Sequence, residues 1–475
     1  MTRQLRELAL RVQLAAFPGT TPDDDARTLL AEGLGGVCLF GSNTADGPDA
    51  VAAYAAAVHA ASPTALVSVD EEGGDVTRLH VTDGSPVPGP AALGRIDDLA
   101  TTRAVGRAVG AELAELGVDL DLAPVADVNS NPDNPVIGTR SFGAEPERVA
   151  AHVAAWIDGL QEAGVAACAK HFPGHGDTDA DSHLALPRVE ADPTTLEARE
   201  LAPFRTAVAA GARAVMTSHI LVPALDPDRP ATLSPVVLGL LRHSLSFGGA
   251  IVTDALDMAG ASAGRGIPEA AVQSLAAGAD LLCLGADKDA GLVRAVQAAI
   301  VDAVRSGRLA EQRLRDAADR AGRLRVEDRP GSAAAGPASD VVPLLRRALV
   351  LEGRLPVLAG ARVVTVATAA NIAIGEAVWG LPTDHVVVPG GPLDLPGPDD
   401  GTAVVVQARD AARHPEVGAV LDALRRARPD RPVLVVEWGW PGTWTRPEPR
   451  LCTYGSSRPA VVAVTETLRE AGWDR

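Results

Sequence analysis

Short apolar runs rich in β-branched residues recur along the first part of the chain, with amphipathic stretches between them. Eight of these runs are predicted to be strands: residues 12–17, 36–40, 65–69, 120–125, 165–169, 214–217, 250–253 and 281–284. Intervening stretches such as 99–116 and 148–163 carry apolar residues at spacings of three and four, as helices do. Alternating strands and helices indicate βα units around a parallel sheet, so we predict an α/β fold with a (β/α)8 TIM-type barrel.

A second, smaller unit is predicted beyond the barrel. The charged helix expected at 310–325 ends the barrel, which we assign to residues 1–327. Residues 328–340 are rich in Pro, Gly, Ser and Ala without periodicity and are expected to be a linker. Residues 341–475 are predicted to form a small α/β sandwich with a final helix at 459–471, because apolar runs again alternate with helical stretches, at 363–367, 385–388, 403–407 and 432–437.

Composition and charge narrow the possible functions. With 475 residues, 47% hydrophobic and 22% charged, the chain has ample material for a buried core. A formal charge of −18 opposes binding to nucleic acid or to an anionic membrane surface, so neither is expected as a partner. The four cysteines form no CxxC pair, so we expect them to be buried thiols. No run of 18 apolar residues that could span a membrane occurs, so we expect a cytoplasmic location. The oligomeric state stays open.

Polar side chains collect where the predicted strands end. In a parallel barrel these strand ends meet around one mouth, which is where such folds place their active sites. Ten polar residues occupy these positions: Asp70, Arg78, Asp127, Asn129, Arg140, Lys170, His171, Ser218, His219 and Asp254. Lys170 is notable because only two residues of the chain, Lys170 and Lys288, are lysines.

The densest polar segment is residues 170–187, KHFPGHGDTDADSHLALP, whose glycines and prolines predict a structured loop. Besides a plain solvated loop, two chemical interpretations remain open. One is a metal site, because imidazole and carboxylate at these spacings can bind zinc, with the ligands His171, His175, Asp177 and His183. The other is an Asp-x-His dyad, in which Asp181 orients His183 for proton transfer near neutral pH.

The segment KHFPGHGDTDADSH strongly resembles the signature of glycoside hydrolase family 3 β-N-acetylglucosaminidases of the NagZ type. Further matching blocks occur in the order expected for that family, over most of the first 290 residues: GGVCLFGSN, SVDEEGGDVTRL, NPDNPVIGTRSFG, VMTSHI, IVTDALDMAGA and AAGADLLCLG. The C-terminal part resembles the second domain of the family only loosely.

This resemblance implies site roles residue by residue. Asp254 would be the catalytic nucleophile and His183 the general acid/base, with Asp181 as its partner; no metal or cofactor is implied. The sugar in the −1 subsite would be bound by Asp70, Arg78, Arg140, Lys170 and His171. A carboxylate at the anomeric carbon and an acid at the departing oxygen are what retaining glycoside cleavage requires. Asp257, three residues after Asp254, is a rival nucleophile on spacing alone.

Two residues depart from the pattern of the family. Asp75 stands where relatives often carry arginine, and Thr77 stands where glutamine is common. We expect these changes to affect the outer subsites. The acid/base dyad lies in the barrel loop, so the second domain is not required to supply an acid, and we expect it to be a structural cap or a dimerisation surface.

The leading hypothesis is a retaining exo-β-N-acetylglucosaminidase acting through a covalent glycosyl-aspartate on small GlcNAc-containing glycans, such as cell-wall fragments or chitobiose-like sugars. A β-N-acetylglucosaminide phosphorylase is an alternative, because a neutral histidine repels inorganic phosphate less than a glutamate does. A metal-dependent hydrolase using the His/Asp loop is the alternative from a different class. The last alternative is a sugar-binding module without catalytic activity.

Overall fold

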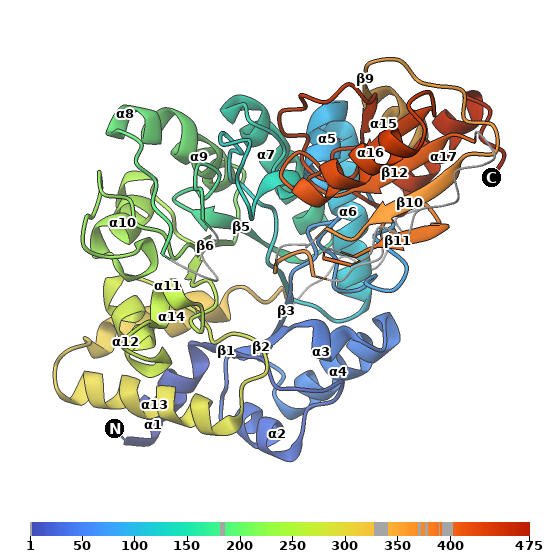
Figure 1. The fold of residues 1–475 in the computed structure, drawn as a ribbon. Helices are drawn as coiled ribbons and strands as arrows, with labels where there is room; N and C mark the ends of the chain where they lie inside the picture. Colours follow the sequence, from blue (N-terminus) through green and yellow to red (C-terminus); the bar gives the residue numbers. More distant parts are fainter. Residues whose placement is uncertain are drawn as a thin grey trace.

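The computed structural model describes residues 2–180, 186–326, 341–368, 372–375, 379–388, 390–391 and 402–475. Its first sheet is an almost closed ring of eight parallel strands in the order β7-β6-β5-β4-β3-β2-β1-β8 (Figure 1). A parallel bridge between Val252 and Leu281 connects the two ends of the ring. The strands are β1 (Gln13–Ala15), β2 (Gly36–Leu39), β3 (Leu66–Val69), β4 (Leu120–Asp121), β5 (Ala166–Phe172), β6 (Ala214–Thr217), β7 (Ala250–Val252) and β8 (Leu282–Cys283).

Helices surround this ring on its outer side. The longer ones are α1 (Thr2–Arg11), α2 (Asp24–Ala31), α4 (Pro48–Ala61), α6 (Leu99–Glu115), α7 (Pro146–Glu162), α9 (Leu201–Ala209), α12 (Ile267–Ala277), α13 (Ala290–Arg305) and α14 (Glu311–Gly322). Shorter elements in the connections are α3 (Gly41–Thr44), α5 (Pro90–Ile96), η1 (Gly138–Arg140), α8 (Pro193–Thr195), η2 (Leu196–Glu200), η3 (Ala231–Leu233), α10 (Pro235–Gly239), η4 (Leu240–Ser244) and α11 (Ala259–Ser262). The predicted α/β class and barrel are confirmed.

Two apolar cores hold the barrel together. A large core lies between the strands and the surrounding helices, and a smaller one, mainly leucine and alanine with the thiols of Cys38, Cys168 and Cys283, fills the ring. Helices α6 and α7 pack closely because glycines lie at their contact. A Cβ at Gly159 would lie 2.1 Å from the carbonyl oxygen of Arg103, so any larger residue would push the two helices apart.

The second domain is a six-stranded sheet in the order β11-β10-β12-β13-β14-β9, in which only β9 runs antiparallel to its neighbour. One face packs on α17 (Arg458–Glu470) and the other on α16 (Pro415–Ala427), which makes the predicted α/β sandwich. A further helix, α15 (Val342–Ala348), precedes the sheet. The strands of this second sheet are β9 (Val350–Glu352), β10 (Arg362–Val366), β11 (His385–Val387), β12 (Val404–Ala408), β13 (Val433–Glu437) and β14 (Arg450–Cys452).

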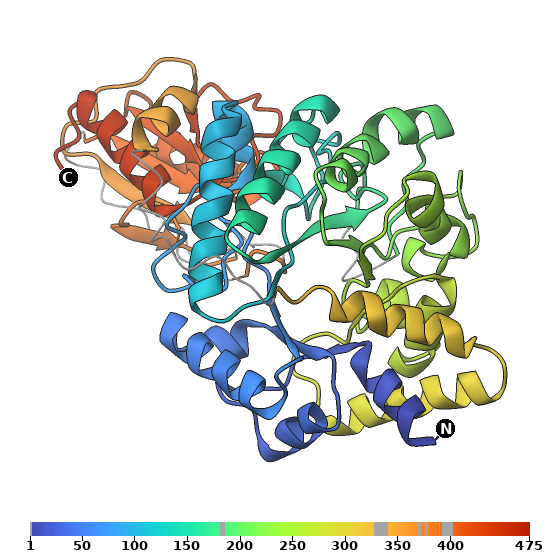
Figure 2. The ribbon, with the colours of Figure 1, turned by 180° about the vertical axis from the view of Figure 1, so that it is seen from behind.

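The second domain packs against the side of the barrel that carries α5 (Figure 2). An apolar cluster joins Ala92 of α5 to Leu345 of α15 and Ala463 of α17. The backbone N–H of Arg458 donates to the carbonyl oxygen of Ser85 at 2.9 Å. The predicted linker, residues 328–340, lies outside the described residues, so the division at 327 and 341 stays a prediction.

All eight barrel strands were predicted, although their ends differ. Strand β4 is shorter than expected, and β5 extends to Phe172, so Lys170 and His171 lie within the strand. Strands β9 and β14 were not predicted. Within the described part of the chain, no helix is both long and apolar enough to span a membrane.

Candidate active site

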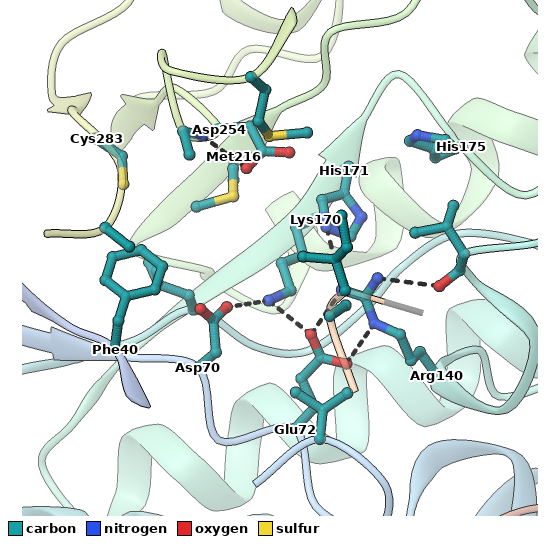
Figure 3. A pocket seen from close by; sticks show the side chains of 18 of the residues that line it. Phe40, Asp70, Glu72, Arg140, Lys170, His171, His175, Met216, Asp254 and Cys283 are labelled. Atoms are coloured by element: carbon teal, nitrogen blue, oxygen red, sulfur yellow. Dashed lines mark hydrogen bonds and ion pairs between the residues drawn. The ribbon is translucent and has the colours of Figure 1, made fainter. Parts of the chain in front are cut away.

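A cavity of about 250 Å³ opens at the carboxyl ends of the barrel strands (Figure 3). Residues from the ends of seven barrel strands, β2 to β8, line it, together with Ile372 and Ala373 of the second domain. All five residues expected to bind the sugar, and the expected nucleophile, are among its lining residues: Asp70, Arg78, Arg140, Lys170, His171 and Asp254. The dyad Asp181–His183 lies outside the described residues, so its position relative to this cavity is not part of the structure.

Lys170 is the central cation of the cavity. Its Nζ lies 2.5 Å from Asp70 Oδ1 and 2.7 Å from Glu72 Oε1, and its side chain is only 2% exposed (Figure 3). Burial by itself lowers the pKa of Lys170, but the two carboxylates outweigh it and hold the pKa above its ordinary value. Lys170 is therefore a fixed positive charge that tethers Asp70 at the cavity wall.

Glu72 joins Lys170 to Arg140. Arg140 donates from Nε to Glu72 Oε2 at 2.9 Å and from Nη2 to Oε1 at 2.8 Å, a bidentate pair. Burial raises the pKa of Glu72, yet the charges of Arg140 and Lys170 hold it well below the usual range. Sequence reasoning missed Glu72. The signal that could have found it is charge balance, since two buried cations need more than the single carboxylate of Asp70.

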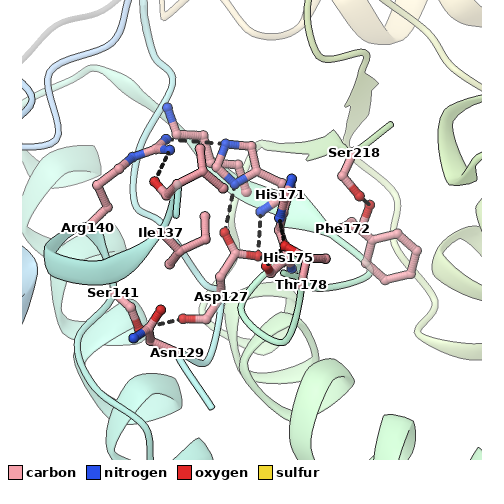
Figure 4. A network of polar contacts seen from close by, with 12 residues as sticks. Asp127, Asn129, Ile137, Arg140, Ser141, His171, Phe172, His175, Thr178 and Ser218 are labelled. Atoms are coloured by element: carbon pink, nitrogen blue, oxygen red, sulfur yellow. Dashed lines mark hydrogen bonds and ion pairs between the residues drawn. The ribbon is translucent and has the colours of Figure 1, made fainter. Parts of the chain in front are cut away.

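His171 is oriented by Asp127 (Figure 4). The Nδ1 of His171 lies 2.7 Å from Asp127 Oδ2, and its Nε2 lies 3.4 Å from Nη2 of Arg140. Because a guanidinium only donates, Nε2 accepts and Nδ1 carries the proton, which assigns a neutral imidazole with Nε2 toward Arg140. Asp127 Oδ1 also accepts the backbone N–H of His171 at 3.2 Å and that of His175 at 2.7 Å.

The loop after β5 is packed tightly under this network. His175 Nδ1 lies 2.8 Å from the hydroxyl of Thr178, and Asn134 Nδ2 donates to the carbonyl oxygen of His175 at 2.9 Å. A Cβ at Gly176 would lie 1.8 Å from the carbonyl oxygen of Val128, so only glycine fits there. Burial lowers the pKa of His175 to about 4, which keeps the ring neutral near pH 7.

The two carboxylates after β7 have different surroundings. Asp254 lines the cavity, and its Oδ1 accepts the backbone N–H of Ala255 at 2.7 Å. Asp257 forms an ion pair with Lys288, the other lysine, with Nζ 2.8 Å from Oδ2. Asp257 also lines the cavity, but a carboxylate whose oxygen is held by an ammonium group is a weaker nucleophile, so this contact weakens the case for Asp257 in covalent chemistry.

Arg78 connects the barrel to the second domain. Its Nη2 donates to the carbonyl oxygen of Ala373 at 2.9 Å, and its backbone N–H donates to Glu71 Oε2 at 2.8 Å. Asp75 is not among the described lining residues of the cavity; its carboxylate contacts Thr139, Arg409 and Ser456. Asp75 therefore lies at the domain interface, and the expected effect of this residue on the outer subsites stays a prediction.

The proposed metal ligands are only partly described, because His183 lies outside the described residues. His171 and His175 have ring nitrogens at hydrogen-bond distance from Asp127 and Thr178, and Asp177 pairs with Arg199. Among the residues that the structure describes, no group of three His, Cys, Asp or Glu side chains is arranged to bind a metal ion.

Comparison with known proteins identifies the family. Residues 4–324 match the glycosyl hydrolase family 3 N-terminal domain. The chain therefore belongs to glycosyl hydrolase family 3, as its motifs indicated.

Individual relatives are similar over different shares of their length. Beta-hexosaminidase A of Pseudoalteromonas piscicida is 34% identical over 334 residues, which cover 65% of this chain and 56% of that protein. A beta-hexosaminidase of Alkalilimnicola ehrlichii is 38% identical over 281 residues, covering 57% of this chain and 79% of the relative.

Among solved structures, a family 3 β-N-acetylglucosaminidase from Paenibacillus has 31% identity and a TM-score of 0.84, covering 99% of this chain and 97% of its own. NagZ from Neisseria gonorrhoeae has 31% identity and a TM-score of 0.58, covering 71% of this chain and 95% of its own. The two-domain architecture is thus shared with the Paenibacillus enzyme over nearly the whole chain.

The low pKa of His175 predicts a specific loss of stability in acid. Between about pH 6.5 and about pH 4 the unfolded chain binds a proton at this residue that the folded chain does not. The free energy of unfolding should therefore fall as the pH drops through this window, by at most about 1.4 kcal/mol per pH unit, and be unaffected above it. His175→Asn should lose less stability than the wild type between about pH 7 and about pH 5, measured from urea midpoints.

His243→Asn is the matched control, because His243 is exposed on η4. This variant should lose as much free energy of unfolding as the wild type when the pH is lowered. Equal losses in His175→Asn and the wild type would contradict the assignment of this effect to His175.

Proposed function

We propose that this chain is a retaining exo-β-N-acetylglucosaminidase, which releases terminal β-linked GlcNAc through a covalent glycosyl-aspartate. The observation that carries the proposal is the convergence of Asp254 with Lys170, Asp70 and Arg140 in one cavity of about 250 Å³. That volume lies just below the roughly 300–1,000 Å³ typical of small-molecule sites, which suits one sugar unit and removal of terminal residues. The named family 3 β-N-acetylglucosaminidase structures support the same substrate class.

The proposed roles follow from the charges and hydrogen-bonding groups around the cavity. Asp254 attacks the anomeric carbon to form the covalent intermediate, which water then hydrolyses. Asp70, with its position fixed by Lys170, accepts from sugar hydroxyls, while Arg78, Arg140 and Lys170 donate to them. His171 accepts a sugar hydroxyl at Nε2 in place of the long 3.4 Å contact with Arg140, because the ring nitrogen has one lone pair.

The proton in this mechanism is transferred by His183, oriented by Asp181. His183 donates to the departing glycosidic oxygen and then removes a proton from the attacking water. The substrates proposed are small GlcNAc-containing glycans such as cell-wall fragments or chitobiose, acted on in the cytoplasm. We keep residues 1–327 as the proposed catalytic unit and 341–475 as the second domain.

Product analysis with chitobiose tests the function and the identity of the acceptor together. In phosphate-free buffer we expect GlcNAc, formed first as the β-anomer because a double displacement retains configuration. Proton NMR during early turnover identifies the anomer. Formation of GlcNAc 1-phosphate in phosphate buffer would assign a phosphorylase, whereas no turnover of chitobiose or of an aryl GlcNAc glycoside would overturn the proposal.

Asp254 should carry the covalent label from a slow fluorinated glycoside. The intermediate accumulates because fluorine destabilises the oxocarbenium-like transition state of both steps while a good leaving group keeps formation faster than hydrolysis. Peptide mass spectrometry locates the label. Asp257→Asn, which removes the partner of Lys288, should still be labelled at Asp254. Label on Asp257, or no adduct in an active wild type, would disprove this assignment.

Replacement of His183 by Ala should produce a leaving-group dependence. General acid–base help is worth roughly 10²- to 10⁴-fold, but an acidic phenol departs with little protonation. The variant should therefore lose far more kcat/KM with chitobiose than with an activated aryl glycoside, and azide should restore deglycosylation. Asp181→Asn should show the same pattern more mildly. Equal losses for both substrates, without azide rescue, would make His183 a binding residue.

A further inference from the structure

Asp75 is buried between the two domains, in the turn that follows β3. Its Oδ2 accepts from the hydroxyl of Thr139 in the barrel at 2.7 Å. Its Oδ1 accepts from two groups of the second domain, the Nη2 of Arg409 at 3.2 Å and the backbone N–H of Ser456 at 3.1 Å. The Asp75 side chain is 4% exposed, so this carboxylate depends on these partners for its stability.

Arg409 is itself held in place for this contact. It follows β12 directly, its side chain is 5% exposed, and its guanidinium lies 4.9 Å from the ring centroid of Trp379. Burial raises the pKa of Asp75 and lowers that of Arg409, in each case against the effect of the partner's charge. Each charged group therefore needs the other, and the pair exists only when the two domains are packed together.

The turn that carries Asp75 also carries residues of the cavity. The backbone N–H of Glu72 donates to the carbonyl oxygen of Val76 at 3.1 Å, which closes a tight turn over residues 72–76. Gly74 has a φ of +60°, and a Cβ there would lie 2.4 Å from Cα of Gly89, so the turn has little space to move. A displacement of Asp75 therefore moves Glu72 as well.

A second contact between the domains lies at the other end of the same segment. Arg78 donates to the carbonyl oxygen of Ala373, so the second domain holds the segment at Asp75 and again at Arg78. Between them these two positions enclose Val76, another lining residue of the cavity. Glu72, the first residue of the turn, binds both Lys170 and Arg140.

We propose that Asp75 is a positioning residue through which the docked second domain fixes the segment from Glu72 to Arg78, and with it the sugar-binding groups of the barrel. The second domain then contributes to binding of the terminal sugar without providing the acid/base. This inference rests on the proposed function in one respect: the activity assay below uses a GlcNAc glycoside as substrate.

The test compares Asp75→Ala, Asp75→Asn and Arg409→Met with the wild type, using an aryl GlcNAc glycoside. Misplacement of binding groups by about 1 Å can cost roughly 100-fold, so Asp75→Ala and Arg409→Met should lower kcat/KM by roughly 10- to 100-fold. Asp75→Asn keeps the shape and an acceptor oxygen and should lose less. Asp75→Asn combined with Arg409→Met should be more active than Arg409→Met alone, because it removes the unpaired buried carboxylate.

Arg95→Met is the matched control, because Arg95 lies on α5 and makes a different contact between the domains, 5.3 Å from the ring centroid of Tyr454. It weakens docking without touching the segment, so kcat/KM should stay at the wild-type value. If Arg95→Met loses as much kcat/KM as Arg409→Met, the loss of activity comes from weaker docking of the domains in general, and the proposal fails. Wild-type kcat/KM in folded Asp75→Ala would overturn it equally.

Hydrogen exchange provides a measurement that needs no substrate. Amides of residues 72–79 should exchange faster in Asp75→Ala and Arg409→Met than in the wild type and in Arg95→Met. If the wild type cleaves no GlcNAc glycoside, the proposed function fails, but the exchange rates still decide the role of Asp75. Unchanged exchange at 72–79 in Asp75→Ala would refute positioning whatever the substrate is.

Discussion

A buried carboxylate shared by two buried cations holds the mouth of this barrel together. Glu72 binds Lys170 of β5 and Arg140 of η1, while Lys170 also holds Asp70 at the end of β3. Loss of one member leaves an uncompensated charge on a buried side chain, which costs several kcal/mol. The network therefore fixes three separate segments relative to one another, and the shape of the cavity at the strand ends depends on that rigidity.

The barrel was predictable because its strands are buried on both faces and are therefore nearly continuous apolar runs. Where polar residues enter a strand, the prediction was less accurate. Strand β4 ends at Asp121, whose Oδ1 accepts the backbone N–H of Glu71, and β5 continues through Lys170 and His171. Strands β9 and β14 escaped prediction because each has only three residues, including a charged one.

The residues of the site were predictable only in part. Strand-end position gave Asp70, Lys170 and Asp254, because that rule needs only the order of elements along the chain. The role of Glu72 depends on charge balance with residues about 70 and 100 positions away in sequence, which no periodicity records. The contact between Asp75 and Arg409 spans 334 positions and depends on how two domains pack.

The interface at Asp75 also constrains the evolution of domain architecture in chains of this kind. Ancestors or descendants consisting of the barrel alone would lack both Arg409 and Ser456, leaving the aspartate without two of its three partners. Loss or gain of the second domain would then have to be accompanied by substitution at this one position, or the turn beside the cavity would lose its support. A single side chain would in this way record whether a barrel evolved alone or with a companion domain.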